Sequence, residues 1–452
     1  MDEIGHDDGA APDPGRARIW YHTFGCKANQ YDTERMRQEL EARGASTVED
    51  PAAAEVCVLN TCTVTNQADA DARRTIRRVR RRNPRVRIVV AGCSAALRAP
   101  EYRTMRNVTG VVKGQDPVEV AEAAAGGSAL VQLGTDRFLD RIDHEPVGSE
   151  LLRRRNGATR GWLKIQDGCD RNCSFCATRL ARGASRSRDP DQVAREACVL
   201  ARTHPELVLT GIHIGHYGRD LEPELSLSRL LARLLDEVPG VRIRLGSVEA
   251  TEVDDLLLEL MATSGGRVAP HLHMPLQSGA DPVLRRMRRW HTREDYRSRA
   301  LEIVDRLPFL GLGADVITGF PGETERDHLR TVELVEELPY TYLHVFPFSR
   351  REGTVADELW EEDPVPQRVA GERSRELREL ALEKGRRHRA ARIGGRARVV
   401  LEGTSGRGLT GDYFRVRVRD APAEPRAGLL AAVLRGTADD PYIDLSRPEA
   451  LS

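Results

Sequence analysis

Short apolar runs alternate with amphipathic stretches along the first part of the chain. Residues 19–24, 56–61 and 88–92 are rich in β-branched side chains, which is typical of buried parallel strands. Between them, residues 31–43 and 68–82 place apolar side chains at helical spacing. This alternation predicts an N-terminal α/β domain built on an open parallel sheet.

A second series of alternating strand and helix patterns runs from residue 161 onward. The predicted helices include residues 226–238 and 293–307, and the predicted strands are residues 207–211, 241–246, 271–275 and 312–317. Repeated βα units of this length predict a full or partial barrel whose chemistry lies at the carboxyl ends of its strands.

The pattern changes once more after a charged helix predicted at residues 372–392. Short apolar runs separated by Gly and Pro follow, as in a small antiparallel β-barrel, at residues 396–401, 413–418 and 429–433. Three domains are therefore expected, with bounds at residues 17–145, 155–390 and 391–446. Residues 1–16 are expected to form a disordered arm, and residues 153–157, within the weakly patterned stretch 126–160, are expected to form the linker.

Composition and charge narrow the functional classes. The chain of 452 residues has 69 basic and 69 acidic side chains, so no global field draws it to nucleic acid, and the distribution of charge matters more than its sum. No run of 18 apolar residues is present, so no segment is expected to cross a membrane. The acidic start at residues 1–8 has no apolar core of a signal peptide, so no secretory signal is expected.

Three of the 8 cysteines lie in a single C-x3-C-x2-C run, formed by Cys169, Cys173 and Cys176. Thiolates hold iron–sulfur clusters, and a [4Fe–4S] cube normally takes four of them, so three close cysteines leave one iron with an open position. A zinc site is the alternative, but closed zinc sites use four ligands, usually as paired C-x2-C units, and this run has no second pair. The run therefore predicts a [4Fe–4S] cluster.

Three further cysteines, Cys26, Cys62 and Cys93, each follow a predicted strand of the N-terminal sheet. Ligands of open parallel sheets gather at the carboxyl ends of the strands, so these thiols are expected to converge although they lie far apart in sequence. The alternative is that they are small apolar fillers, since free cysteine is among the most buried residue types. That alternative fits better for Cys57, inside a strand, and for Cys198, on the apolar face of a helix. The strand-end cysteines therefore favour a second metal site.

These cysteine motifs resemble those of a known family. The C-x3-C-x2-C run resembles that of the radical SAM superfamily, in which the open iron binds the amino and carboxylate groups of S-adenosylmethionine (SAM). Residues 23–34 and 60–69 resemble the amino-terminal domain of the radical SAM methylthiotransferases, where three separated cysteines hold an auxiliary [4Fe–4S] cluster tied to sulfur delivery. The resemblance extends from about Arg18 to about Val433.

The resemblance implies a fold class and a set of cofactors. The fold class is α/β, with an N-terminal open parallel α/β domain, a central partial (βα)6 radical SAM barrel and a small C-terminal antiparallel β-barrel like the RNA-binding TRAM domain. The implied cofactors are SAM and two [4Fe–4S] clusters, one on the catalytic cysteines Cys169, Cys173 and Cys176 and one on Cys26, Cys62 and Cys93. Because oxygen-sensitive clusters and unpaired thiols need a reducing compartment, we expect a cytoplasmic protein.

Three strand exits of the predicted barrel carry glycine and histidine motifs, and glycine there lets the backbone approach a ligand closely. By the resemblance, residues 209–218 meet the amino group of SAM, and a tight turn with solvent-facing histidines is the alternative. In residues 271–279, His271 and His273 share one face of a strand; the resemblance implies a SAM and substrate pocket, and a metal-ligand pair is the alternative. Residues 315–324 form a glycine-rich exit without the lysine of a phosphate-binding P-loop.

Arginines follow the cysteine run at residues 182–188. They fit either the carboxylate of SAM or an RNA phosphate, and both roles stay open. The cofactor-binding candidates are therefore Thr210, Gly211, His213, Arg186, His273, Gln277, Ser278, Asp315 and Gly319.

One basic stretch indicates contact with RNA. Nine arginines lie between Arg73 and Arg87, and at helical spacing Ile76 and Val79 fall opposite most of them. A solvated surface helix is the alternative, but such a density of positive charge in a neutral protein favours phosphate contact. A second basic set, residues 384–389, leads into the C-terminal β domain.

Residues 60–66, 209–213 and 344–349 most resemble the methylthiotransferase branch that acts on N6-threonylcarbamoyladenosine. The resemblance implies an enzyme that converts this nucleoside at position 37 of tRNA to its 2-methylthio derivative. Its implied partners are the tRNA substrate, a reducing electron donor of the flavodoxin or ferredoxin type and a sulfur source. The family's usual residues after its cluster cysteines are replaced at positions 94–96 and 177–180, so substrate packing there is expected to differ.

Three alternatives to this function stay open. Two of them are enzymes, one acting on isopentenyl-adenosine in tRNA and the other on an aspartate of a ribosomal protein. The third is an iron–sulfur RNA-binding protein without turnover. Modified mass in a nucleoside or in a ribosomal peptide would separate the first two, and 5′-deoxyadenosine production from SAM would exclude the third.

Overall fold

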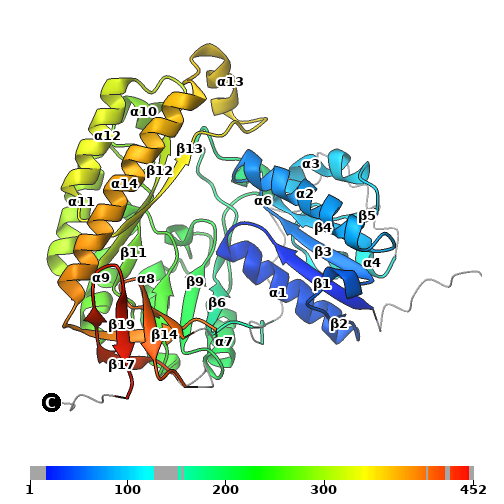
Figure 1. Ribbon diagram of the computed structural model, residues 1–452, viewed down its shortest axis with the longest axis horizontal. Helices are drawn as coiled ribbons and strands as arrows, with labels where there is room; N and C mark the ends of the chain where they lie inside the picture. Colours follow the sequence, from blue (N-terminus) through cyan, green and yellow to red (C-terminus); the bar gives the residue numbers. More distant parts are fainter. Residues whose placement is uncertain (1–16, 127–150, 154–156, 404–405, 423–427, 447–452) are drawn as a thin grey trace, which may run out of the picture. The chain divides into compact units, whose positions relative to one another are not determined.

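The computed structural model describes residues 17–126, 151–153, 157–403, 406–422 and 428–446. The chain divides into two compact units (Figure 1): residues 1–140 with Leu180–Arg182, and residues 141–179 with 183–452. The predicted arm at residues 1–16 and most of the predicted linker lie outside the described residues. The three domain bounds given above stay a prediction of the sequence.

The first unit is built on a five-stranded sheet in the order β2-β1-β3-β4-β5, with every neighbouring pair parallel. The strands are β1 (Arg18–Thr23), β2 (Ser46–Thr47), β3 (Val56–Thr61), β4 (Arg87–Gly92) and β5 (Val108–Val111). Side chains of the fully buried β3 alternate between two cores, with Val56 and Val58 in one and Cys57 and Leu59 in the other. The predicted open parallel sheet is therefore confirmed.

Helices cover both faces of this sheet. They are α1 (Lys27–Ala42), α2 (Asn66–Arg82), α3 (Cys93–Arg103) and α4 (Pro117–Ala124). Residues of α1 and α4 join the core that contains Val56, and residues of α2 and α3 join the core that contains Cys57. The helix α1 begins directly after Cys26, earlier than its apolar pattern indicates, because its first turn is polar and still buried.

Six parallel strands of the second unit form two three-stranded sheets, β10-β9-β6 and β11-β12-β13. A parallel bridge between Ser247 and His273 joins the two sheets, which gives the partial six-stranded barrel that the resemblance implies. The strands are β6 (Arg160–Lys164), β9 (Glu206–Thr210), β10 (Arg242–Leu245), β11 (His271–His273), β12 (Gly311–Thr318) and β13 (Tyr342–Pro347). In β13 only Val345 is buried, while His344 and Phe346 are exposed.

Further short elements and outer helices complete the barrel. The short elements are β7 (Gln166–Asp167), β8 (Arg186–Ser187), η3 (Ile214–His216), η4 (Ala250–Glu252), α10 (Asp281–Arg286) and α13 (Val355–Glu362). The helix α6 (Thr178–Arg182) is divided between the two units. The longer helices are α7 (Pro190–Ala201), α8 (Leu227–Glu237), α9 (Asp255–Thr263), α11 (Arg293–Arg306), α12 (Glu325–Glu337) and α14 (Gln367–Arg392). Among the described residues, no helix has both the length and the apolar character that a membrane span needs.

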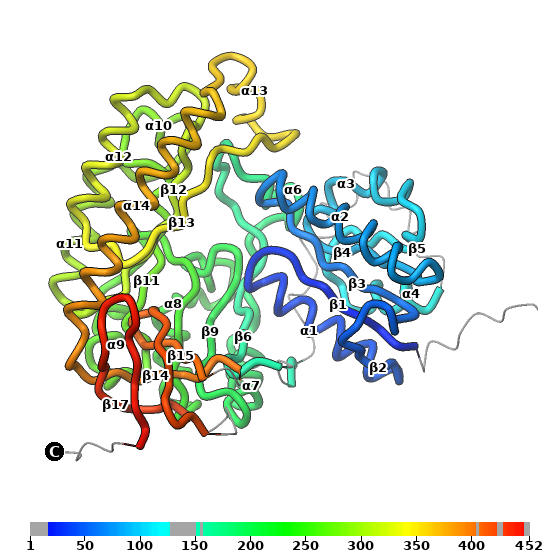
Figure 2. Tube along the Cα trace, viewed as in Figure 1, coloured from blue at the N-terminus to red at the C-terminus, as the bar shows by residue number. Residues whose placement is uncertain are grey.

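The C-terminal strands, orange to red in Figure 2, form a six-stranded sheet in the order β17-β14-β15-β16-β19-β18. They are β14 (Arg396–Leu401), β15 (Arg407–Thr410), β16 (Arg415–Arg419), β17 (Leu430–Val433), β18 (Arg435–Gly436) and β19 (Pro441–Asp444). Val399, Val416 and Ile443 fill its interior, as predicted for a small β-barrel. The pairing of β16 with β19 is parallel, and the other described pairings are antiparallel.

A buried ion network joins the barrel to the C-terminal sheet. Glu206 begins β9, and Arg242 and Arg244 of the neighbouring β10 donate to its carboxylate; the Nε of Arg244 lies 2.9 Å from Oε1. The remaining guanidinium nitrogens donate to main-chain carbonyls of the C-terminal sheet, at 2.7 Å for Arg398 and 2.8 Å for Gly411. Burial alone would raise the pKa of Glu206, but Arg244 and Arg242 outweigh it and lower the pKa to about 2. The sheet therefore caps the amino-terminal end of the barrel strands.

We predict that Glu206→Gln lowers the free energy of unfolding of the protein by about 3–5 kcal/mol, because it leaves two buried guanidinium groups without their counter-charge. Urea denaturation of the full chain measures this loss. Asp440→Asn is the matched control, since it breaks the exposed Arg417–Asp440 pair of the same sheet, and it should cost less than about 1 kcal/mol. Equal losses in the two variants would contradict the role given to Glu206.

Candidate functional site

The three strand-end cysteines of the first unit lie together. Cys26 is the N-cap of α1, Cys62 directly follows β3, and Cys93 is the first residue of α3. The pKa of Cys62 is raised to about 12, mainly by burial and further by the neighbouring thiols of Cys93 and Cys26. A Cβ on Gly25 would lie 2.5 Å from the Sγ of Cys62, so only glycine lets the chain before Cys26 pass over Cys62. The convergence expected from the parallel sheet is present in the structure.

Two asparagines fix the loops that carry these cysteines. The Nδ2 of Asn29 donates to the carbonyls of Phe24 and Thr61, each at 2.9 Å, and so ties the loop before Cys26 to the loop before Cys62. The Nδ2 of Asn60 donates to the carbonyl of Asn29 at 2.8 Å. Both asparagines are fully buried. Their motifs carried the family resemblance, but their supporting role comes from the structure.

Arg182 belongs to the first unit by its contacts. Its Nε lies 3.2 Å from the Sγ of Cys93, and a terminal nitrogen lies 2.9 Å from the carboxylate of Asp32. The side chain of Arg182 is buried, so the site places a fixed positive charge next to a cysteine sulfur. Positive charge near sulfur stabilises the thiolate form that metals require.

The loop of Cys169, Cys173 and Cys176 has a shape that main-chain bonds hold. The amide of Cys169 donates to the carbonyl of Gly183 at 3.1 Å, and the amide of Cys176 donates to that of Cys173 at 3.1 Å. The hydroxyl of Ser174 donates to the carbonyl of Arg286 at 2.7 Å. The loop is thereby anchored both to the segment after α6 and to the end of α10.

The thiols of this loop also lie close to one another. Burial raises the pKa of Cys169 to about 12, and the thiols of Cys176 and Cys173 raise it further. Such thiols stay protonated unless a metal displaces the proton, and soft thiolates are ligands of iron–sulfur clusters. Three sulfurs at each of the two sites fit a cluster that keeps one iron without a cysteine.

The turn after β9 is held by a residue that sequence reasoning missed. The Oε1 of Gln166 accepts from the amides of Ile212 at 3.0 Å and of His213 at 2.8 Å. A Cβ on Gly211 would lie 2.7 Å from the carbonyl oxygen of Gln166, so glycine is needed for this close packing. Thr210, the last residue of β9, is buried beside it. Gln166 lies 46 and 47 positions from Ile212 and His213 in sequence, so no local pattern marks these contacts.

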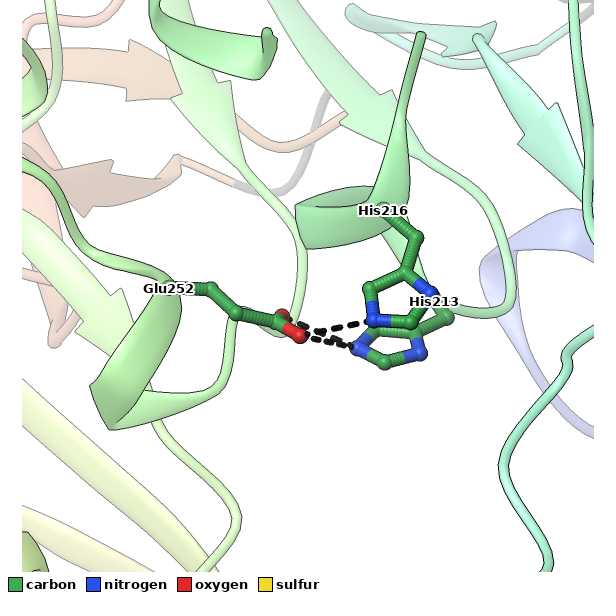
Figure 3. A group of neighbouring side chains, drawn as sticks. All are labelled: His213, His216 and Glu252. Carbon is green, nitrogen blue, oxygen red and sulfur yellow. Dashed lines mark hydrogen bonds and ion pairs between the residues drawn. The ribbon is translucent and has the colours of Figure 1, made fainter. Parts of the chain in front are cut away.

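His213 and His216 are buried, which excludes the alternative of a turn with solvent-facing histidines. Figure 3 shows both rings directed at the carboxylate of Glu252. The Nε2 of His213 lies 2.9 Å from each carboxylate oxygen, the Nε2 of His216 lies 3.1 Å from Oε1, and the two rings stack at 3.9 Å. Burial by itself raises the pKa of Glu252, but the two histidines outweigh it and hold that pKa well below its usual range.

The same three side chains could ligate a metal ion, since their ligand atoms lie within 4.8 Å of one another. A guanidinium nitrogen of Arg171, however, lies 3.4 Å from the Glu252 carboxylate. This neighbouring positive charge disfavours a divalent cation there. The arrangement is therefore better described as a hydrogen-bonded group that orients His213, whose Nδ1 lies 3.6 Å from the Sγ of Cys169.

His271 and His273 share one face of β11, as the sequence predicts, and both bind the hydroxyl of Tyr342, at 2.8 and 3.0 Å. The other nitrogen of His273 lies 3.1 Å from Asp315, which His344 also contacts at 3.2 Å. Burial raises the pKa of Asp315, but these two histidines outweigh it and hold the pKa well below its usual range. The polar row opens to solvent at His344, which is 52% exposed.

The remaining candidates support the exits of β11 and β12. Gln277 has φ +67, and its amide donates to the carbonyl of Asp315 at 2.8 Å. Ser278 is fully buried. Gly319 has φ +69, and its amide donates to the Glu323 carboxylate at 2.6 Å. These contacts fix the strand exits that the resemblance assigns to SAM.

Most of the arginines after the cysteine loop are not available to a ligand. Arg188 is buried and donates to both carboxylate oxygens of Glu196, at 3.2 and 3.0 Å. Arg182 is engaged with Asp32. These two members of the predicted ligand run are therefore structural, and Arg186 lies half-buried on β8.

Two protein-family models match parts of this chain. Residues 18–114 match the family model described as uncharacterized protein family UPF0004, and residues 163–335 match that of the radical SAM superfamily. A protein of Bacillus subtilis named threonylcarbamoyladenosine tRNA methylthiotransferase MtaB is 38% identical over 376 residues, which is 80% of this chain and 79% of that protein. The protein of that name from Thermotoga maritima is 34% identical, over 90% of this chain and 91% of its own length. The chain belongs to the radical SAM methylthiotransferase family.

This radical SAM methylthiotransferase is also similar to proteins whose names give a different nucleoside. A tRNA-2-methylthio-N(6)-dimethylallyladenosine synthase of Sorangium cellulosum is 34% identical over 84% of this chain and 81% of that protein. Among solved structures, the radical SAM methyltransferase TsrM of Kitasatospora setae superposes with a TM-score of 0.55 at 14% identity, over 77% of this chain and 78% of that one. That likeness shows the fold. Family membership makes the chain an enzyme that uses SAM and [4Fe–4S] clusters.

The remaining cysteines serve as controls for the two clusters. We propose that Cys62 and Cys173 are ligands of different clusters, so Cys62→Ala and Cys173→Ala should each lower the iron content of the reconstituted protein by about four atoms per chain. Cys57→Ala and Cys198→Ser should keep the full iron content, since Cys57 fills the core within β3 and Cys198 lies on α7. Iron analysis measures both effects. A loss of about four irons in either control would contradict the ligand assignment.

Proposed function

We propose that this methylthiotransferase acts on tRNA and converts N6-threonylcarbamoyladenosine at position 37 to its 2-methylthio derivative. The observation that carries the proposal is the 38% identity, over four fifths of the chain, to a relative named for that nucleoside. Relatives named for the dimethylallyl nucleoside reach 31% and 34%. The polar side chains of the barrel interior also support this choice.

The interior near β12 and β13 is polar where a substrate can reach it. Asp315 is 28% exposed and His344 is 52% exposed, and the ring of Tyr342 lies beside them. A threonylcarbamoyl group has a carboxylate, a hydroxyl and urea nitrogens that can replace the water on such side chains. A dimethylallyl group would remove that water without replacing its hydrogen bonds, which costs free energy.

The chain's own residues supply position and enclosure for the reaction. Cys169, Cys173 and Cys176 would hold the SAM-cleaving cluster, and Cys26, Cys62 and Cys93 the auxiliary cluster. When bound, these groups supply the electron and the sulfur chemistry, and the protein supplies orientation and exclusion of water. Gln166 fixes the turn at Gly211, so that backbone can approach SAM, and the C-terminal sheet closes the opposite end of the barrel.

The exposed face of α2 supports RNA binding. Ile76 and Val79 are buried, as predicted, while Arg77, Arg78 and Arg81 are exposed. Within the described residues, these three arginines make no ion pair, whereas Arg73 and Arg74 are paired with Glu101 and Asp71. The second basic set is weaker, because Lys384, Arg386, Arg387 and Arg389 all have intramolecular partners.

Nucleoside masses test the proposed reaction. We expect a methylthio-threonylcarbamoyladenosine peak in digested tRNA that disappears when the gene is deleted and returns with the wild-type gene. Complementation with Cys169→Ala should not restore it, because the variant lacks a cluster ligand. A change confined to the isopentenyl nucleoside would assign the enzyme to the other branch, and an unchanged profile would contradict a tRNA substrate and direct the search to ribosomal peptides.

Replacing Arg77, Arg78 and Arg81 together by Ala should weaken binding of unmodified tRNA. Because fewer counterions are released when phosphate contacts are lost, the slope of the logarithm of the binding constant against the logarithm of the salt concentration should fall in magnitude by roughly 2 to 3. Fluorescence anisotropy at several salt concentrations measures this. The control replaces the exposed Arg229, Arg326 and Arg375 by Ala, which removes the same charge from α8, α12 and α14. An equal effect in both triple variants would contradict a specific role for α2.

A further inference from the structure

Arg289 lies against a sulfur of the radical SAM loop. Its terminal nitrogen lies 3.6 Å from the Sγ of Cys173, within donor distance for sulfur. Arg289 comes from the segment that follows α10 and not from the cysteine loop itself. The guanidinium is therefore a separate part of the fold that has been brought to this sulfur.

A buried carboxylate holds Arg289 in place. The other terminal nitrogen of Arg289 lies 2.5 Å from the Glu249 carboxylate, and the two side chains are 3% and 9% exposed. The guanidinium also lies over the Trp290 ring, with its carbon 4.1 Å from the centroid. These contacts fix the direction of the N–H groups, which is what a hydrogen bond to sulfur requires.

The Nε–H group of Arg289 can donate a further hydrogen bond. Its Nε is buried and has no hydrogen-bond partner within the described part of the chain. A buried donor without a partner is costly, and an acceptor bound beside the Cys173 sulfur would satisfy it. The guanidinium nitrogen that lies 3.6 Å from the Sγ of Cys173 also brings positive charge close to this sulfur.

We propose that Arg289, positioned by Glu249, donates N–H···S hydrogen bonds to the cluster at Cys173 and raises its reduction potential. The proposal rests on the assignment of Cys169, Cys173 and Cys176 as cluster ligands. Reduction adds one electron from an external reductant and converts [4Fe–4S]2+ to [4Fe–4S]+, with no bond made or broken. The added negative charge is stabilised by a fixed cation and by hydrogen bonds to sulfur, which are known to set such potentials.

The test uses the full chain with Cys26, Cys62 and Cys93 replaced by Ala, so that a single cluster remains. Potentiometric titration with dithionite, followed by electron paramagnetic resonance and without SAM, gives the potential. Arg289→Met should lower the reduction equilibrium constant about tenfold, which is about 59 mV toward negative potential for one electron. Iron content and visible absorption show whether the cluster is intact.

Arg286→Met is the matched control. It removes the same charge from the end of α10, but the Arg286 guanidinium bonds to the carbonyl of Pro321 and to Asp363 and not to a cysteine. It should change the equilibrium constant less than about twofold. If Arg289→Met loses iron, Arg289→Lys replaces it: lysine keeps the charge but not the two-pronged donor geometry, and the potential should again become more negative.

Two results would overturn the inference. One is an unchanged potential in an Arg289 variant that keeps about four irons. The other is weakened SAM binding with an unchanged potential, which would assign Arg289 to the SAM carboxylate. Failure of the ligand assignment is distinguishable from both, because the parent protein without Cys26, Cys62 and Cys93 would then hold no cluster of about four irons.

Discussion

The second unit depends on the buried charge network of Glu206, Arg242 and Arg244. A six-stranded barrel is incomplete, and its amino-terminal end would expose the first residues of its strands to water. Burying three charged groups there is costly unless every polar atom finds a partner. The carboxylate accepts from both guanidinium groups, and the outward nitrogens donate to carbonyls of the C-terminal sheet. The sheet thus closes the amino-terminal end of the barrel and leaves the carboxyl ends of the strands free for chemistry.

In each unit, a buried carboxylate holds an arginine side chain close to a cysteine that is a proposed cluster ligand. Glu249 holds Arg289 near Cys173, and in the first unit Asp32 holds Arg182 near Cys93. Buried thiols resist ionisation, so the protein without a cluster favours neutral thiols at these sites. Binding of a cluster instead requires negatively charged thiolates there. A buried arginine that is paired with a carboxylate suits both states. It stabilises the thiolates when they form, and its charge is already paired when the thiols are protonated.

Local patterns predicted the parallel sheet, a full or partial barrel and the positions of the cysteines, because strand ends and helix faces follow from residues close in sequence. The buried side of α2 at Ile76 and Val79 is an example. The supporting residues were not predictable in this way. Gln166 meets His213 across 47 positions and Arg289 meets Cys173 across 116, and sequence periodicity records polarity but not partners. The strand β13 was also missed, and Val345 is the one buried residue in it.

For the proposed function, the polar side chains inside the barrel limit which substituent of the adenosine the barrel can accept. Asp315 is already bound by His273 and His344, so the row needs no ligand for its own stability, but its exposed atoms are hydrated. A substituent that offers hydrogen bonds can take the place of this water at little cost, whereas an apolar one must remove it without compensation. Discrimination would then arise from the penalty imposed on the wrong substituent more than from added attraction to the right one. Such selectivity needs a rigid row, and the Tyr342 hydroxyl, which binds both His271 and His273, provides that rigidity.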